Sequence, residues 1–200
     1  MKKIIMTGNP EYGICEAFSK KREATYVSRT SGMDLTKPDS WRDLAKQSLD
    51  YDVFINNSAL WRMHQTLLLK TVYDAWFENE KSGLIICIGS TADVGIRGGS
   101  RLYPVEKAAL RDMCRRLSFA ALGGSGIRVS LLSPGYVNTP GTEEKHPSKN
   151  KISTEYVAEV LDWLIDQPEH LMFNEISLDP IQEEDQSRDR RIHDPNKKTK

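Results

Sequence analysis

Cysteine is scarce in this 200-residue chain, which indicates neither a disulfide framework nor a cysteine metal site. The three cysteines, Cys15, Cys87 and Cys114, are odd in number and form no C-x-x-C pair. Each lies in an apolar segment expected in the core, where a free thiol behaves as a small hydrophobic group. Such usage is typical of a reducing compartment, so we expect a cytoplasmic protein without a bound metal.

An excess of either charge is also lacking, because lysine plus arginine and aspartate plus glutamate number 28 each. No overall field therefore favours nucleic acid or an anionic membrane surface. Long apolar runs are lacking too. Three apolar residues follow Met1-Lys2-Lys3, too few for a secretion signal, and no stretch approaches the ~20 apolar residues of a membrane span. We expect no nucleic-acid partner, no membrane span and a small-molecule ligand.

The length of the chain suits one domain with a single hydrophobic core. Residues 181–200 contain two isoleucines among charged and polar residues, so little apolar burial offsets the entropy of ordering them. The sequence therefore predicts one domain over residues 1–180 and a flexible charged tail over residues 181–200.

Short apolar runs alternate along the chain with segments of helical period. The runs, which we expect to be strands, cover residues 3–6, 25–27, 53–55, 84–88, 127–132 and 172–178. Continuous apolar character, as in residues 84–88, indicates a strand buried on both faces, which is typical of parallel sheets covered by helices. Helical spacing recurs near residues 68–76, 110–117 and 157–165, and Thr36-Lys37-Pro38-Asp39 indicates a capped helix start. The pattern predicts an α/β fold, a doubly wound Rossmann-type parallel sheet of about six strands flanked by helices.

Polar and glycine-bearing motifs follow these strands in a definite order. Along the chain they are the turn from Thr7-Gly8 to Gly13, Asn56-Asn57-Ser58-Ala59, Ser90, Tyr103 with Lys107, and the segment from Ser133 to Thr139. Tyr103 and Lys107 are four residues apart, so on a helix they share one face. Such a pair arises easily by chance, and the alternative for Lys107 is a solvated helix lysine. The pair becomes significant because all the motifs occur in this order along the chain.

This arrangement resembles the short-chain dehydrogenase/reductase family over residues 3 to about 180. Members carry T-G-x-x-x-G-x-G, N-N-A-G, a serine about thirteen residues before Y-x-x-x-K, and P-G-x-V-x-T; Ser90 stands thirteen residues before Tyr103. The resemblance implies an oxidoreductase that transfers hydride between a nicotinamide cofactor and a small carbonyl or alcohol substrate. It also implies pairing into a homodimer or homotetramer.

The resemblance implies catalytic roles for three residues. Tyr103 would give or take the substrate proton, and Ser90 would hold and polarise the carbonyl oxygen. Lys107 would bond the nicotinamide ribose and lower the pKa of the tyrosine, whose free phenol titrates near 10. Thr91 is the alternative to Ser90, which also suits a plain turn after Gly89.

The resemblance also implies the cofactor contacts. The pyrophosphate turn would comprise Gly8, Asn9, Tyr12, Gly13 and Ile14, the adenosine contacts Asp34, Leu35, Asn57 and Ser58, and the nicotinamide contacts Lys107, Pro134, Gly135, Val137 and Thr139. No acidic residue ends the second strand, whereas Arg29 there can pair with a 2′-phosphate, so NADP(H) is favoured over NAD(H). The alternatives are an ordinary strand-to-helix turn and a solvated arginine.

The sequence departs from the family pattern in several places. One extra residue lies between the first glycines, and Cys15 stands where the last glycine is usual. A helix and a short strand are missing between Arg29 and Asp34, which leaves the second strand at an edge of the sheet. The helix before Ser90 is shortened at its start.

An asparagine that family members carry in the helix before Ser90, thought to hold a water in the proton path, has no clear counterpart. The nearest candidates are His64 and Gln65, and His64 also suits a surface position. Residues 140–152 form a short polar lid that suits a small substrate. These departures motivate a second hypothesis, a catalytically weak or inactive NADP-binding protein with a regulatory or interaction role.

Overall fold

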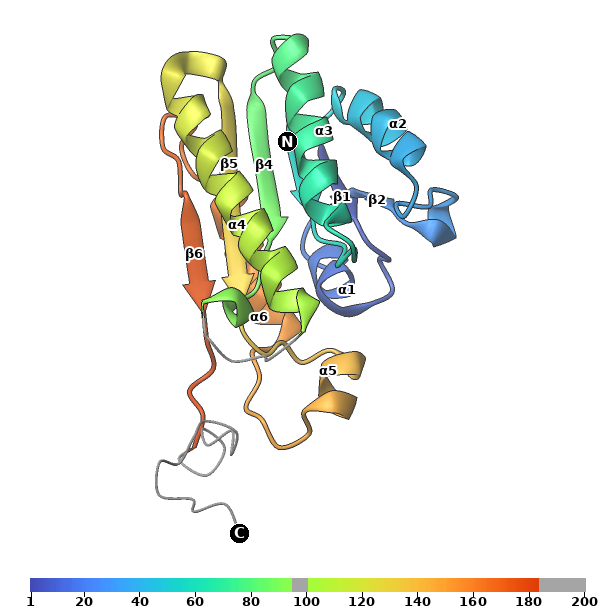
Figure 1. The fold of residues 1–200 in the computed structure, drawn as a ribbon, viewed down its shortest axis with the longest axis vertical. Helices are drawn as coiled ribbons and strands as arrows, with labels where there is room; N and C mark the ends of the chain where they lie inside the picture. The colour runs from blue at the N-terminus through green and yellow to red at the C-terminus, as the bar shows by residue number, and fades with distance from the viewer. Residues whose placement is uncertain (95–100, 184–200) are drawn as a thin grey trace.

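The computed structural model describes residues 1–94 and 101–183, and its centre is a parallel sheet of six strands. The strands are β1 (Ile4–Thr7), β2 (Thr25–Val27), β3 (Val53–Asn56), β4 (Gly83–Ile88), β5 (Ile127–Pro134) and β6 (Glu175–Leu178). Their order is β2-β1-β3-β4-β5-β6, and every neighbouring pair is parallel (Figure 1). The predicted six-stranded Rossmann-type sheet, with the second strand at an edge, is confirmed.

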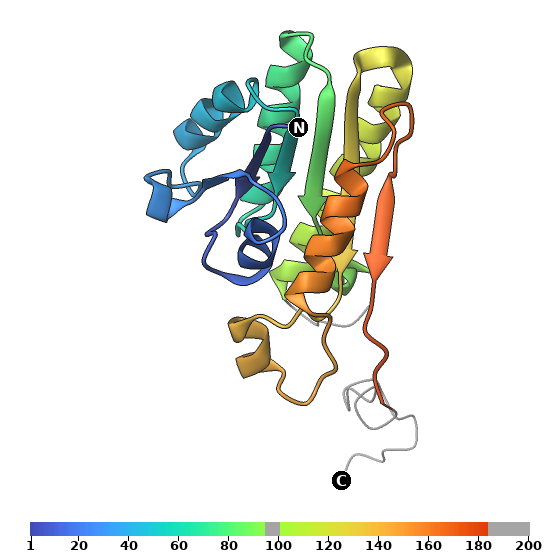
Figure 2. The same ribbon diagram turned by 180° about the vertical axis from the view of Figure 1, so that it is seen from behind.

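Helices cover both faces of this sheet. They are α1 (Gly13–Ser19), α2 (Pro38–Ser48), α3 (His64–Glu78), α4 (Leu102–Ala120), α5 (Pro140–Lys145) and α6 (Thr154–Ile165). One core cluster joins the sheet to α2, α3 and α4, which lie in front in Figure 1. A second cluster joins it to α1 and α6, seen from behind in Figure 2. This two-sided covering explains why the strands are continuously apolar.

Strand β4 illustrates that covering residue by residue. Ile85 and Cys87 belong to the cluster with α3 and α4, whereas Leu84 and Ile86 belong to the cluster with α1 and α6. Alternate side chains of a strand point to opposite faces of the sheet, and helices cover both faces, so all four side chains are buried. The apolar run therefore carries two core faces in one strand.

The start of α2 differs in detail from the sequence prediction. The N-cap is Lys37, with Pro38 as the first helical residue, and no side-chain hydrogen bond caps this end. Thr36, the expected cap, instead donates its hydroxyl to Asp34 at 2.8 Å. Pro38 suits the first helical position because it has no N–H to satisfy and its φ is already near the helical value.

Within residues 1–94 and 101–183, no helix combines the length and the apolar character needed to cross a membrane. The same residues hold no cluster of three or more metal-ligating side chains. Of the predicted tail, residues 184–200 lie outside the described part of the chain.

The topology places one crevice at the carboxyl edge of the sheet. The chain passes from β1 to β2 on one side and then returns to place β3 on the other side of β1. In open α/β sheets this reversal leaves a crevice outside the strand ends, which is where ligands bind. The predicted turn motifs follow the strands, and Tyr103 and Lys107 lie in the first turns of α4, so all of them gather at this edge, the lower one in Figure 1.

Candidate active site

A groove of about 850 Å³ lies at the carboxyl ends of β1, β2 and β3. Among its lining residues are these predicted cofactor contacts: Gly8, Asn9, Tyr12, Gly13, Ile14, Arg29, Asp34, Leu35, Asn57, Ser58 and Thr139. They come from the glycine turn, the end of β2, the turn after β3 and the start of α5. The fold therefore brings together most of the residues that the sequence pattern selected.

Four predicted cofactor residues, Lys107, Pro134, Gly135 and Val137, are not among those that line this groove. Val137 is buried, and its backbone pairs with that of Ile152. Gly135 donates its N–H to the carbonyl of Leu178 at 2.7 Å and packs against Asp179. Together with Pro134, the last residue of β5, they belong to the other side of the carboxyl edge. Their contacts with nicotinamide stay predictions.

The glycine turn is held by a contact that only glycine permits. Gly8 has a φ of 136°, and a Cβ there would lie 2.4 Å from the sulfur of Cys15 and 2.9 Å from the amide nitrogen of Asn57. Asn57 in turn donates to the carbonyl of Thr7 at 3.1 Å and to the Cys15 sulfur at 3.1 Å. Burial raises the pKa of the Cys15 thiol to about 12, so this thiol stays protonated and serves as a packing group.

Thr7 is a site residue whose role the sequence reasoning missed. Its hydroxyl oxygen accepts hydrogen bonds from the N–H groups of Asn57 and Ser58, both at 2.9 Å. These bonds tie the turn after β3 to the end of β1. The sequence did mark Thr7, because this residue opens the glycine motif. Only the strand order shows that its hydroxyl contacts the turn after β3.

The end of β2 bends into a short 3₁₀ turn over Arg29–Ser31. The Ser31 hydroxyl accepts from the N–H of Ser28 at 2.8 Å and donates to its carbonyl at 2.9 Å. Gly32 closes the turn in the left-handed region with a φ of 90°. This compact turn replaces the missing helix and strand and leaves Arg29 exposed on the groove.

Ser90 and Tyr103 are neighbours, as the sequence predicts. Ser90 follows β4 and is 7% exposed, and its hydroxyl oxygen accepts from the N–H of Ala92 at 3.2 Å. Burial raises the pKa of the Tyr103 phenol above its usual value, and the neighbouring Ser90 hydroxyl partly opposes that rise. Thr91, the alternative to Ser90, donates instead to Asp179 at 2.6 Å.

Lys107 is a buried lysine, so the alternative of a solvated helix lysine is wrong. Its side chain is 5% exposed, and its ammonium donates to the Gln65 amide oxygen at 2.8 Å and to the Ile88 carbonyl at 2.9 Å. The amine lies 5.7 Å from the ring centre of Tyr103. Burial lowers the pKa of Lys107 to about 8. The expected lowering of the tyrosine pKa by this lysine is not seen here, because the amine faces Gln65 and the strand end.

Gln65 takes a position for which the sequence left two candidates. It is 4% exposed, and its amide nitrogen donates to the carbonyls of Asn56 at 3.0 Å and Ile88 at 3.1 Å. Asn56 returns a hydrogen bond to the Gln65 backbone at 2.9 Å. His64, the other candidate, packs edge-on against Trp41 with 5.1 Å between ring centres. Gln65 therefore contacts the amine directly.

A loop before α3 separates the groove from Tyr103 and Lys107. Trp61 in this loop lies 5.9 Å from the ring of Tyr103, centre to centre, and lines both the groove and a void of about 20 Å³ beside the tyrosine. Arg62 and Met63 have φ values of 61° and 62°, and both donate their N–H groups to Glu106. The sequence reasoning did not identify this use of the glutamate in Y-P-V-E-K.

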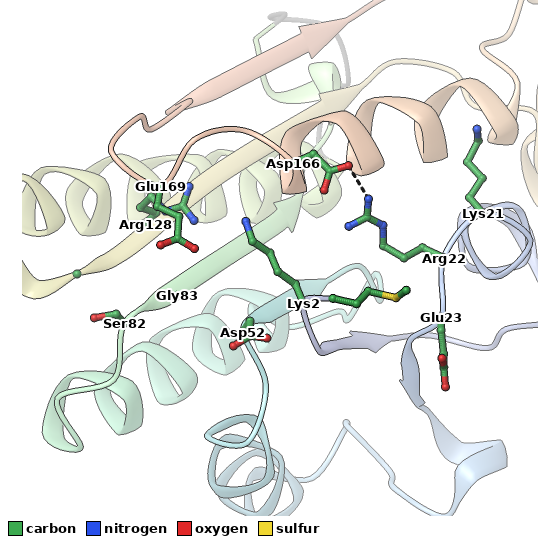
Figure 3. Close-up of a pocket in the computed structure, with 12 residues that line it drawn as sticks. Lys2, Lys21, Arg22, Glu23, Asp52, Ser82, Gly83, Arg128, Asp166 and Glu169 are labelled. Atoms are coloured by element: carbon green, nitrogen blue, oxygen red, sulfur yellow. Dashed lines mark hydrogen bonds and ion pairs between the residues drawn. The ribbon is translucent and has the colours of Figure 1, made fainter.

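A cavity of about 1080 Å³ lies at the opposite end of the sheet. Figure 3 shows the charged side chains around it, among them Lys2, Arg22, Asp52, Arg128 and Asp166. Charges of both signs face this cavity, and Arg22 is paired with Asp166 at 2.7 Å. It adjoins the amino ends of β4 and β5, away from the predicted motifs, so it is not the candidate active site.

Comparison with known proteins agrees with this geometry. A family model described as enoyl-(acyl carrier protein) reductase matches residues 65–170, slightly more than half of the chain. The chain belongs to the short-chain dehydrogenase/reductase family. An uncharacterized oxidoreductase of Staphylococcus saprophyticus is 24% identical over 206 residues, with 90% of this chain and 87% of the relative covered. A second one from the same organism is 30% identical over 183 residues, with 74% of each chain covered.

Solved structures of the family share the fold. One titled short chain dehydrogenase/reductase family protein has a TM-score of 0.71 at 20% identity, covering 88% of this chain and 95% of the other. Another, titled ElxO with NADP bound, has a TM-score of 0.71 at 15% identity, with 90% and 98% covered. As a member of this family, the protein is an oxidoreductase that depends on a nicotinamide cofactor.

Proposed function

We propose that the protein is an NADP(H)-dependent reductase or dehydrogenase that acts on a small carbonyl or alcohol, with Tyr103 as general acid and base. The observation that carries this proposal is the meeting of three side chains at the carboxyl edge. Ser90 lies beside the Tyr103 phenol, and the amine of Lys107 lies 5.7 Å from the ring centre of Tyr103. These groups come from the end of β4 and from α4, beside the groove of about 850 Å³.

The residues present fit a dinucleotide at its adenosine end. The glycine turn, Arg29 and Asn57 present polar groups to the groove, and its volume lies in the range of cofactor sites. The close contact at Gly8 keeps the turn free of side chain where a diphosphate backbone would approach. The void of about 20 Å³ beside Tyr103 is smaller than a nicotinamide ring, so we propose that Trp61, which lines it, moves when the cofactor enters.

The chemistry then divides among three side chains. The bound cofactor would supply or accept the hydride. Ser90 would donate its hydroxyl to the substrate oxygen and stabilise the negative charge that develops there. Tyr103 would pass its phenolic proton to that oxygen, or receive it in the reverse direction. The positive charge of Lys107 would favour the phenolate left behind once the amine turns from Gln65 and Ile88 toward the phenol.

Arg29 supports NADP(H) as the preferred cofactor. It borders the groove beside Ser28 at the end of β2, the position where an acidic residue would bind a ribose diol and repel a 2′-phosphate. The guanidinium can bind a phosphate by two parallel hydrogen bonds, and the Ser28 hydroxyl stands next to it. Asp34 also borders the groove, and hydrogen bonds from Thr36 keep its pKa below the usual range.

A small substrate suits the narrow surroundings of Tyr103. Trp61 covers one side of the phenol, and the segment after Thr139 contributes only the six-residue helix α5 and a short loop. The N–H of Gly141 in α5 donates to the hydroxyl of Tyr12 at 3.3 Å, so this short lid contacts the glycine turn. Little apolar surface is available here for a large substrate.

The remaining proposals concern organisation. We propose a cytoplasmic protein without nucleic-acid or membrane partners, with residues 1–180 as one NAD(P)-binding domain. Pairing into a homodimer or homotetramer is supported by exposed apolar side chains on α3 and α4. They are Leu67, Phe77, Leu102, Val105 and Phe119.

A second candidate function is cofactor binding with little or no turnover. It is favoured by the inward direction of Lys107, whose amine donates to Gln65 and Ile88. It is also favoured by the raised pKa of Tyr103. Both observations describe a pair that must rearrange before it can transfer a proton near neutral pH.

One experiment separates these functions. Fluorescence titration with NADPH and NADH measures binding, and oxidation of NADPH with a panel of small aldehydes, ketones and quinones measures turnover. The reductase proposal predicts tighter binding of NADPH and turnover with at least one of these substrates. Tyr103→Phe should abolish turnover while leaving NADPH binding nearly unchanged. Binding without any turnover supports the second candidate, and full activity of Tyr103→Phe contradicts the mechanism.

A further inference from the structure

A buried arginine, Arg111, lies on the same face of α4 as Tyr103 and Lys107. Arg111 stands four residues after Lys107 and eight after Tyr103, so the three side chains follow one another on adjacent turns of one helix face. Arg111 is 6% exposed. Its guanidinium binds both carboxylate oxygens of Asp93, from Nε at 2.7 Å and from Nη2 at 2.8 Å. Asp93 is itself almost fully buried, at 1% side-chain exposure.

The same guanidinium contacts the residues on either side of this pair. It donates to the backbone carbonyl of Ser90 at 3.4 Å and to the hydroxyl of Ser133 on β5 at 3.1 Å, and it forms an ion pair with Glu175 on β6. One side chain thus joins the ends of β4, β5 and β6 to α4. Arg111 thus contacts Ser90, the residue that lies beside the phenol of Tyr103.

We propose that Arg111 is a positioning residue that fixes the Ser90 hydroxyl against Tyr103, acting through Asp93 and the Ser90 carbonyl. This inference rests on the proposed function, because it assigns a purpose to the placement of Ser90. The link is short. Ser90 caps the 3₁₀ turn Thr91–Asp93, and Asp93, the last residue of that turn, is the one that Arg111 binds with two parallel hydrogen bonds.

The local backbone needs such an anchor. A three-residue 3₁₀ turn holds few hydrogen bonds of its own and does not set its direction strongly. Gly89, just before it, packs so closely on β5 that a Cβ would lie 2.4 Å from the Ser133 hydroxyl. Arg111 binds that same hydroxyl. Gly89 is therefore held by β5, and Ser90 and Asp93 are held by the guanidinium.

Stability alone does not account for this arrangement. Moving two charges out of water costs about as much as their attraction returns, and apolar residues of similar size are often equally stable. What the guanidinium adds is direction, because its planar fork matches both carboxylate oxygens of Asp93 at once. A lysine cannot reproduce that geometry with a single ammonium group.

The test compares a single and a double change. Arg111→Met leaves the buried Asp93 carboxylate unpaired, so it lowers both Tm and activity. Asp93→Asn combined with Arg111→Met removes both charges and should recover most of the Tm while kcat stays about tenfold or more below that of the unchanged protein, roughly the effect of one charge-assisted hydrogen bond. Recovery of kcat together with Tm overturns the proposal. Arg111→Lys should keep the fold and still lose most of kcat, and full activity of this variant also overturns it.

A double-mutant cycle with Ser90 shows whether Arg111 acts through that residue. Ser90→Ala removes the hydroxyl that Arg111 is proposed to place, so Arg111→Lys should have little further effect on kcat in the Ser90→Ala background. Effects that multiply would mean that Arg111 acts by another route, which overturns the proposal.

Hydrogen exchange provides a reading that does not depend on turnover. In the Asp93→Asn, Arg111→Met protein, amides in the peptide covering residues 89–94 should exchange about tenfold or more faster, while those in β1 and β3 stay protected. Unchanged exchange overturns the proposal. If the unchanged protein shows no turnover, the proposed function fails, and this measurement still decides whether Arg111 holds Ser90.

Discussion

Replacing Lys107 by methionine measures how strongly the fold penalises its charge. The ammonium is buried between Gln65 and the end of β4, and burial lowers its pKa from 10.5 to about 8. In the unfolded chain the pKa returns to the usual value. Between pH 8 and pH 10.5 the unfolded state therefore binds more protons than the folded state, so stability rises with pH in that window.

The size of this effect follows from the shift. One pKa unit corresponds to about 1.4 kcal/mol, and a lowering from 10.5 to about 8 gives about 3 kcal/mol. Methionine has a similar length and no charge, so Lys107→Met lacks this dependence. The free energy of unfolding of the unchanged protein, minus that of Lys107→Met, should rise by about 3 kcal/mol across the window and stay flat below about pH 7.

Urea unfolding at a series of pH values, followed through tryptophan fluorescence, provides these free energies. Other groups titrate in both proteins, so their contributions cancel in the difference. Lys70→Met is a matched control, because Lys70 is an exposed lysine on α3 paired with Asp74. A difference that stays constant from about pH 6 to pH 10.5 would refute the conclusion that Lys107 carries its charge in a buried site.

Three further predictions concern the groove and the amine. Arg29→Ala should weaken NADPH binding about tenfold and leave NADH binding unchanged, as measured by fluorescence titration; equal losses for both cofactors would remove Arg29 from the phosphate site. Gly8→Ala should lower the free energy of unfolding by about 2–4 kcal/mol because of its positive φ and the contact with Cys15, and Cys15→Ala should recover part of that loss in urea unfolding. A loss below about 0.5 kcal/mol would contradict this reading. Gln65→Met removes an acceptor that favours charged Lys107, so the decline of kcat/KM at high pH should move to lower pH; an unmoved decline would show that the hydrogen bond has no effect on the amine.

Local patterns predicted much of the fold because they report burial directly. Continuous apolar runs such as residues 84–88 marked strands buried on both faces, and helical spacing marked the faces of α3, α4 and α6. The start of α2 was placed one residue early, because Thr36 uses its hydroxyl for Asp34 rather than for the helix. Short-range competition of this kind leaves no clear trace in the sequence.

The site was only partly visible in the sequence. Motifs that directly follow strands, such as Gly8, Asn57 and Ser90, were found because the carboxyl ends of parallel strands meet at one edge. The direction of the Lys107 amine was not foreseen, since it depends on Gln65, which lies 42 residues away in the chain. The Glu106 contact with the loop before α3 was missed for the same reason.

The sequence by itself determined the elements, their order and the residues that reach the carboxyl edge, because each of these follows from periodicity and from chain position relative to strands. Only the tertiary structure decided the partners of the buried polar groups. Arg111, for example, is one more charged residue in a helical pattern until β4, β5 and β6 bring Asp93, Ser133 and Glu175 around it. Such partners are distant in sequence, and it is the cost of leaving a buried charge unpaired that requires them to meet.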